Sequence, residues 1–111
     1  MAVTPVKLYG PTALTGSAAA LFTAPANERY VILQGSALNT DTSGRTLSIH
    51  VVRSGDSAVD GNLVMDEEPI AAHEALILTP LKGLVLEGGD AIYGFADTTS
   101  LVNIVLSGYK A

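Results

Sequence analysis

Turn-forming residues divide this chain into short segments, and this feature limits most strongly the folds that it can adopt. The 111 residues include 11 Gly and 5 Pro, and these recur at about the eight-to-twelve-residue spacing that is typical of β-sandwiches and barrels. No stretch of about twelve or more residues has the apolar period of a helix. The run 18–20 consists of Ala, a good helix former, but Gly16 and Pro25 flank it closely. The sequence therefore predicts an all-β fold.

The strands can be assigned by their composition and by the turns between them. We expect strands at residues 3–9, 19–24, 28–39, 45–53, 62–65, 75–79, 83–86, 91–96 and 101–109. Segments 28–39 and 45–53 are expected to form a hairpin, and so are segments 91–96 and 101–109. The connections are too short for crossover helices. The sequence thus predicts a single domain over residues 1–111, an antiparallel β-sandwich that is jelly-roll-like with about eight strands. Residues 1–10 would form an edge strand or arm, because Pro5 fits an edge position.

Alternation of apolar and polar residues assigns the two faces of these strands. It predicts a core that contains Leu47, Ile49, Val102, Ile104 and Leu106. The polar face of segment 45–53 would carry Thr46, Ser48 and His50. In segment 28–39 one face would carry Val31, Leu33 and Ala37, and the other Tyr30, Ile32, Gln34 and Ser36.

Some faces that should meet solvent carry apolar side chains instead. The chain is 48% hydrophobic and only 15% charged, whereas about 25% charged residues are ordinary. Scattered apolar side chains on a surface are normal, but low charge and apolar outer faces occur together here. We therefore expect a patch that a second subunit or a larger assembly covers. The predicted interface residues are Tyr30, Ile32, Val52 and Val105.

Charge and composition exclude several classes of protein. The net charge is −5, and the six Lys and Arg residues are scattered, so we expect no nucleic-acid partner, which would require clustered cations. Residues 1–10 lack the features of a signal peptide, and no apolar run is long enough to span a bilayer, so we expect no membrane partner. The chain has no Cys, which rules out a disulfide framework and a thiolate metal site.

Side chains that could support chemistry are present but poorly arranged for it. His50 and Ser48 would share a strand face, yet the chain has no G-x-S-x-G nucleophile motif. The polar loop 56–62 lacks the ligand spacing and the closing Glu of a calcium loop. The pair Gly88-Gly89 suits a turn, because no Lys-Ser/Thr follows it as in a phosphate-binding loop.

One acidic cluster could in principle hold a divalent cation. It consists of Asp66, Glu67 and Glu68, with His73 and Glu74 nearby. Its position directly before Pro69 favours a solvated turn. We expect no catalytic residue, no metal ion and no cofactor, so the protein is predicted not to be an enzyme.

Four stretches together resemble a known group of proteins. They are ALFTAPAN at residues 20–27, the long strand that ends with Asn39-Thr40, LVLEGGDAI at residues 84–92 and VNIVLSGY at residues 102–109. The pattern resembles small β-sandwich virion proteins of tailed bacteriophages, over roughly residues 19–109. Length and layout are most similar to the capsid decoration, or cement, proteins of short-tailed phages. Asn27 stands where the pattern often has Gly.

The resemblance implies a structural role without chemistry. It implies a protein that binds the outside of an assembled phage capsid and cements neighbouring major capsid subunits. Its partners would be the major capsid protein lattice and, as a homodimer or other homo-oligomer, further copies of itself. It would be made in the host cytoplasm and act on the capsid surface of the virion. The alternatives are a tail, baseplate or fibre module and a carbohydrate-binding module, although the chain lacks the Trp common in sugar sites.

Overall fold

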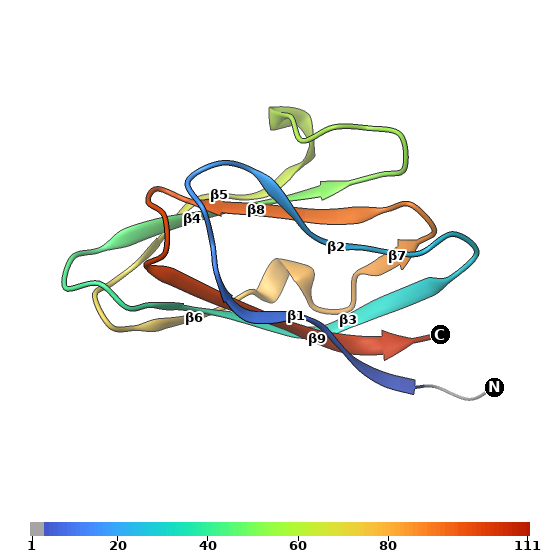
Figure 1. Cartoon of the computed structure of the whole chain (residues 1–111), viewed down its shortest axis with the longest axis horizontal. Helices are drawn as coiled ribbons and strands as arrows, with labels where there is room; N and C mark the ends of the chain where they lie inside the picture. Colours follow the sequence, from blue (N-terminus) through green and yellow to red (C-terminus); the bar gives the residue numbers. More distant parts are fainter. Residues whose placement is uncertain (1–3) are drawn as a thin grey trace.

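The computed structural model describes residues 4–111 and consists of two antiparallel β-sheets stacked as a sandwich (Figure 1). Two single-turn 3₁₀ helices, η1 (Asp60–Asn62) and η2 (Thr79–Leu81), lie in connections. The predicted antiparallel sandwich is confirmed, with nine strands in place of about eight. The strands are β1 (Thr4–Ala13), β2 (Ala19–Thr23), β3 (Arg29–Asn39), β4 (Arg45–Val52), β5 (Leu63–Ile70), β6 (Ala75–Ile77), β7 (Val85–Glu87), β8 (Ala91–Ala96) and β9 (Val102–Lys110).

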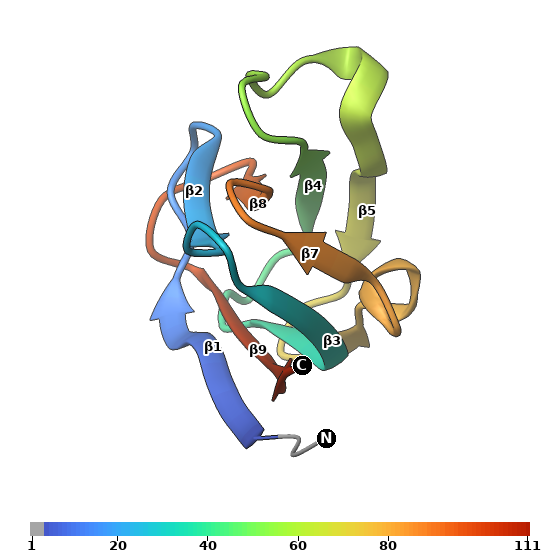
Figure 2. The same ribbon diagram turned by 90° about the vertical axis from the view of Figure 1, so that its right-hand side faces the viewer.

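The order of the strands is that of a jelly roll. The first sheet has the order β1-β9-β3-β6, with the short β7 also paired to β3, and the second sheet has the order β2-β8-β4-β5. If β7 is left out and the other eight strands are renumbered in chain order, the two sheets have the strand orders 1-8-3-6 and 2-7-4-5. These orders are those of the double Greek key in jelly rolls. The view in Figure 2 shows the two layers, with the short β7 beside β3.

Both predicted hairpins are wrong. Strands β3 and β4 belong to different sheets, and so do β8 and β9. The turns at 40–44 and 97–101 carry the chain from one layer to the other. A short polar connection can form a hairpin within one sheet or cross to the other sheet. The crossing is possible because the sheets pack about 10 Å apart, a distance that a few residues can span. Within residues 4–111, β4 and β5 are the consecutive strands that pair with each other.

One hydrophobic core fills the space between the sheets. The five predicted core residues are all buried, which confirms the face assignment of β9 and of the inward side of β4. Their largest buried neighbours come from strands and connections alike: Leu14, Leu78, Leu81, Leu86 and Ile92.

The predicted faces of β3 are wrong over half of its length. Ile32 is fully buried, whereas Leu33 is 50% exposed. The cause is a shift in the pairing of β3 with β9 between Ile32 and Gln34. Such a bulge inserts one residue and moves the following side chains to the opposite face. Ile32 therefore lies in the core and not on an outer face, while Ala37 is buried as expected.

The outer side of β4 is also buried, against expectation. Val52 is 3% exposed, and the polar Ser48 and His50 are 2% and 5% exposed. Strand β4 lies between β8 and β5. Part of the connection 53–62 also folds back over β4, as the distance of 2.8 Å between His50 Nδ1 and Asn62 Oδ1 shows. Alternation could not reveal this cover, since it comes from another segment.

The edge strands carry features that oppose pairing with other strands. Strand β1 is an edge of the first sheet, as Pro5 predicted, and its register shifts twice along β9. Residues 1–3 of the predicted arm lie outside the described residues. The acidic run before Pro69 is part of edge strand β5 and not a turn, although Glu67 has a positive φ of 47°.

Candidate functional site

A buried aspartate joins the turn before β8 to the end of β4. Asp90 Oδ2 accepts hydrogen bonds from Arg53 Nη1 at 2.8 Å and from the Glu87 amide at 3.0 Å, and Oδ1 accepts one from the Ser54 amide at 3.0 Å. Gly89 precedes it with a φ of 89°, and a Cβ there would overlap the Ser54 side chain. The Gly-Gly-Asp stretch thus has a structural role in this fold.

The hydrogen bonds of Asp90 decide its ionisation. Burial of the side chain acts most strongly and by itself would raise the pKa of Asp90. The Glu87 and Ser54 amides and the Arg53 guanidinium together outweigh it and hold the pKa below its ordinary value. The carboxylate is therefore charged near neutral pH, as a structural anchor must be to accept three donors.

A second polar anchor lies at the opposite end of the sandwich. Asn39 is fully buried, and its Nδ2 donates to the carbonyl oxygens of Ser43 at 2.9 Å, Ile70 at 3.0 Å and Ala71 at 3.3 Å. Its Oδ1 accepts a hydrogen bond from the Asp41 amide at 2.9 Å. Asn39 thus fixes the β3–β4 crossing to the end of β5.

His50 has a fixed orientation, but within the described part of the chain no nucleophile is hydrogen-bonded to it. Asn62 Oδ1 accepts from the Val59 amide at 3.1 Å, so it also serves as acceptor toward Nδ1 of His50, which must carry the proton. The His50 ring stacks on Phe95. The Ser48 hydroxyl accepts from the Glu67 amide at 3.0 Å and makes no hydrogen bond to His50. The pair therefore lacks the contact between nucleophile and base that such chemistry requires.

The acidic residues near Pro69 are not gathered into a metal site. Among residues 4–111, no three His, Cys, Asp or Glu side chains converge on one point. Asp66, Glu67 and Glu68 follow one another along the exposed β5 strand, and His73 lies in the connection beyond it. The same part of the chain contains no helix with the length and apolar character of a membrane span.

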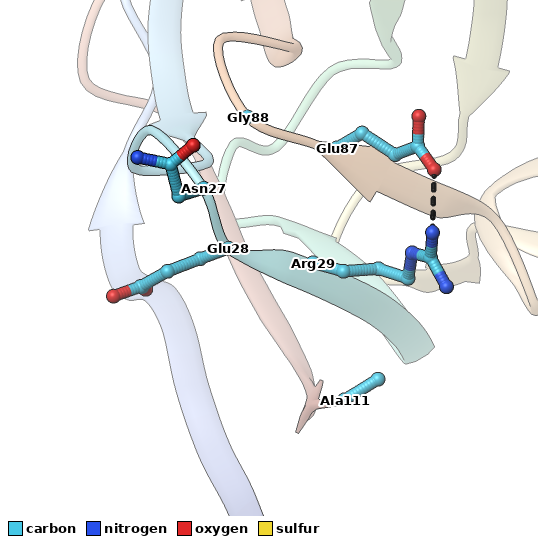
Figure 3. A pocket seen from close by; sticks show the side chains of 6 residues that line it. All are labelled: Asn27, Glu28, Arg29, Glu87, Gly88 and Ala111. Carbon is cyan, nitrogen blue, oxygen red and sulfur yellow. Dashed lines mark hydrogen bonds and ion pairs between the residues drawn. The ribbon is translucent and has the colours of Figure 1, made fainter.

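The hollow at the C-terminal end of β9 is shallow, and its charged groups have partners (Figure 3). It measures about 430 Å³ and is lined by Asn27, Glu28, Arg29, Glu87, Gly88 and Ala111. Arg29 and Glu87 form an exposed ion pair of 2.9 Å across it. Asn27 adopts a φ of 65°, in the left-handed region that Gly and, among other residues, Asn enter most readily.

Glu28, at the rim of this hollow, binds side chains outside it. It accepts a hydrogen bond of 2.7 Å from the Tyr30 hydroxyl and lies 3.3 Å from Lys110 Nζ. The hydrogen bond from Tyr30 acts most strongly and, with the Lys110 contacts, lowers the pKa of Glu28 against the partial burial that would raise it. Each charged side chain that lines the hollow therefore has a partner among the described residues.

The most unusual surface is the outer side of the first sheet. Cross-strand pairing sets Tyr109 beside Val31, and Val105 and Ile77 on either side of Ser36. Leu33, Leu38 and Ile77 are 50%, 42% and 55% exposed. We call this surface the apolar face, and it consists of Val31, Leu33, Leu38, Ile77, Val105 and Tyr109.

Of the four predicted interface residues, only Val105 lies on the apolar face. Ile32 and Val52 are buried, as described above. Tyr30 is half-buried and turns inward, because its ring packs edge-on against Phe22 at 5.1 Å. The bulge in β3 is the reason why Leu33 was missed.

Charge is distributed very unevenly over the molecule. Between Arg53 and Lys82 the sequence has six acidic residues and no Lys or Arg. None of these six forms an ion pair with another described residue, whereas each of the five acidic residues elsewhere does. Five of the six lie on β5 or in the connection before it, at the edge of the second sheet. The unpaired negative charge thus lies mainly on the layer opposite the apolar face.

Comparisons with protein-family models, with curated proteins and with solved structures find no match to this chain.

Proposed function

We propose that this protein is a structural component of a phage virion, without enzymatic activity, that binds the outside of the assembled capsid and cements neighbouring major capsid subunits. One observation carries the proposal: a jelly roll exposes a broad apolar face that would be unfavourable in water on a free monomer. Double-sheet jelly rolls occur in viral capsid domains as well as in lectins. The resemblance of residues 19–109 to small β-sandwich virion proteins of tailed phages, and of the length and layout to their cement proteins, supports a place in the virion.

The proposed mechanism requires no reacting group. A protein that binds the assembled shell, and not the free subunits, stabilises the shell by mass action. Each bound copy ties together subunits that would otherwise separate independently, so many weak contacts add up over a closed lattice. The protein would act on the capsid surface after its synthesis in the host cytoplasm.

Shells assembled with and without the protein test this proposal. Shells that lack it should form but should release their contents at a lower temperature, and purified protein added back should restore the resistance. Serum albumin at equal concentration is the control for unspecific protein. Equal resistance of bare and decorated shells, with the protein bound, would refute the cementing role.

Labelled antibodies in electron micrographs distinguish the virion alternatives. A cement protein should be seen in many copies over the head. Label confined to the tail, baseplate or fibres would instead favour the alternative module. Specific binding on a glycan array, together with no label on the particle, would favour the carbohydrate-binding reading.

A further inference from the structure

The proposed function requires the apolar face to be covered, and on that premise we propose that its first occupant is a second copy of this chain. The two copies would stack their β1-β9-β3-β6 sheets face to face around a two-fold axis. A two-fold contact uses the same patch on both copies, which must therefore be self-complementary. The size, the charge and the edges of this sheet each bear on the inference.

The sheet that carries the apolar face approaches the size of a stable dimer interface. Its five strands together have 36 residues. At about 3.3 Å along a strand and about 4.8 Å between strands, the whole sheet covers about 570 Å². Stable interfaces bury about 600 to 1,000 Å² on each partner. One such sheet stacked on another therefore comes close to the lower end of this range.

The charge of this face permits contact with a copy of itself. In its cross-strand rows within the described residues, the charged side chains are Lys7 on β1 and the Arg29–Glu87 pair at one end. Depletion of charge is the mark of the buried centre of an interface. When two identical faces stack, no cluster of like charges on one copy therefore meets such a cluster on the other.

The unpaired acidic residues point to the same orientation. Five of them lie at the β5 edge of the second sheet and in the connection before it, which stands away from the first sheet (Figure 2). If two copies met through their second sheets, these groups would approach one another and repel. Contact through the first sheets keeps them on the outer layers of the dimer.

Pairing of two copies through strand edges is disfavoured in this fold. Strand β1 contains Pro5 and Pro11, which cannot donate a backbone hydrogen bond, and its register is irregular. Edge strand β5 carries three consecutive acidic residues followed by Pro69. Such features block the addition of strands to β1 and β5, and the other two edges, β6 and β2, are short strands of three and five residues. A second copy therefore meets the face of the first sheet and not an edge.

A dimer of this kind also fits the proposed cementing role. It would present every remaining surface twice, related by the two-fold axis. A molecule with two equal binding surfaces can contact two neighbouring shell subunits at once, which a monomer with a single binding surface cannot do.

Sedimentation equilibrium of the full chain tests the inference. The wild-type protein should have the mass of a dimer at about 100 µM, a concentration at which a dimer of micromolar Kd is nearly complete. Leu33→Glu should weaken the dimer by at least tenfold, because it sets two charges into the desolvated centre. Val64→Glu is the matched control: Val64 is 41% exposed on β5, outside the face, and this variant should stay dimeric.

A folding check and a second variant keep the test decisive. Circular dichroism should show Leu33→Glu folded, since that side chain is half exposed. If Leu33→Glu fails to fold, Ile77→Glu on β6 makes the same test from another strand. A wild-type monomer, a trimer, a dimer unaffected by the charge on the face, or equal weakening by Val64→Glu would each overturn the inference.

The outcomes separate this inference from the proposed function. A wild-type monomer that still strengthens shells would overturn the dimer and leave the cementing role intact. A wild-type dimer that Leu33→Glu weakens, but that neither binds nor strengthens shells, would support the dimer and overturn the cementing role.

Discussion

Replacing the buried Asn39 by Asp is the most informative single change, because the two side chains have the same shape and differ in one group. In the wild type, Nδ2 of Asn39 donates to three carbonyl oxygens within 3.3 Å. In Asn39→Asp an oxygen takes the place of this donor and faces those three carbonyls. Whether the donor matters can thus be measured without leaving a cavity.

The expected loss of stability follows from the number of bonds. Each hydrogen bond contributes about 0.5–1.5 kcal/mol, and a buried carbonyl left without a donor costs about 1–3 kcal/mol. Ser43 lies in an open turn and can recover a bond to water, whereas the bond to Ile70 is buried. We therefore expect Asn39→Asp to lower the free energy of unfolding by about 3–5 kcal/mol at pH 7.5, a large part of the total for a small domain.

The loss should shrink in acid. Burial and the facing carbonyls disfavour the charged form, so the pKa of the new carboxyl in the folded state should lie above its unfolded value. Between those two pKa values the folded state binds more protons than the unfolded state, so stability falls as the pH rises through the folded pKa. A protonated Asp also regains one donor.

Urea unfolding followed by circular dichroism measures this prediction at pH 7.5 and pH 5, with the wild type at each pH as reference. Asn103→Asp is the matched control, since Asn103 is half exposed on β9 and should change stability by less than about 0.5 kcal/mol. If Asn39→Asp were as stable as Asn103→Asp at pH 7.5, the anchoring role of Asn39 would be wrong. A loss that stays the same in acid would refute the assigned cause.

Three further changes test other parts of the fold. Ile104→Ala should lower the free energy of unfolding by about 2–5 kcal/mol because Ile104 is in the core; an unchanged melting temperature would contradict the face assigned to β9. Asp90→Asn should cost about 1–3 kcal/mol near neutral pH. Because the folded pKa of Asp90 is lowered, its contribution is present above the unfolded pKa and is lost as the pH falls through the folded pKa. Urea titrations below about pH 4 should thus depend less on pH in Asp90→Asn than in the wild type. Gly89→Ala should cost about 1–3 kcal/mol through its positive φ and the overlap with Ser54, while Gly61→Ala, in open space, should be nearly neutral in the same assay.

Much of the fold could be predicted because each strand carries its own signal. Turn residues and alternation locate most of the strands, and the regular β9 reveals its buried side directly. The partition between sheets could not be predicted in the same way. A polar turn of a few residues can reverse within a sheet or cross to the other, and the choice depends on contacts such as those of Asn39 with the distant Ile70.

Of the residues predicted for the candidate surface, only Val105 lies on the apolar face. The excess of apolar side chains over charges indicated that such a face exists, and Leu33 and Ile77 are indeed exposed. The bulge after Ile32 then exchanged the sides of β3, so that Ile32 entered the core and Leu33 came to the surface. A bulge depends on how two strands pair, and the alternation of residues in one strand gives no information about the strand with which it pairs.

The position of β9 has a consequence for the way a new molecule is made. This strand leaves the ribosome after the other eight, yet it lies between β1 and β3 and joins them into one sheet. Until β9 has been made, β1 has no partner in that sheet, and the edge of β3 that pairs with β9 has no neighbouring strand. Folding that waits for such distant pairing is slow and leaves apolar strands open to aggregation. A growing chain therefore completes neither the first sheet nor the outer surface of that sheet before β9 has been made.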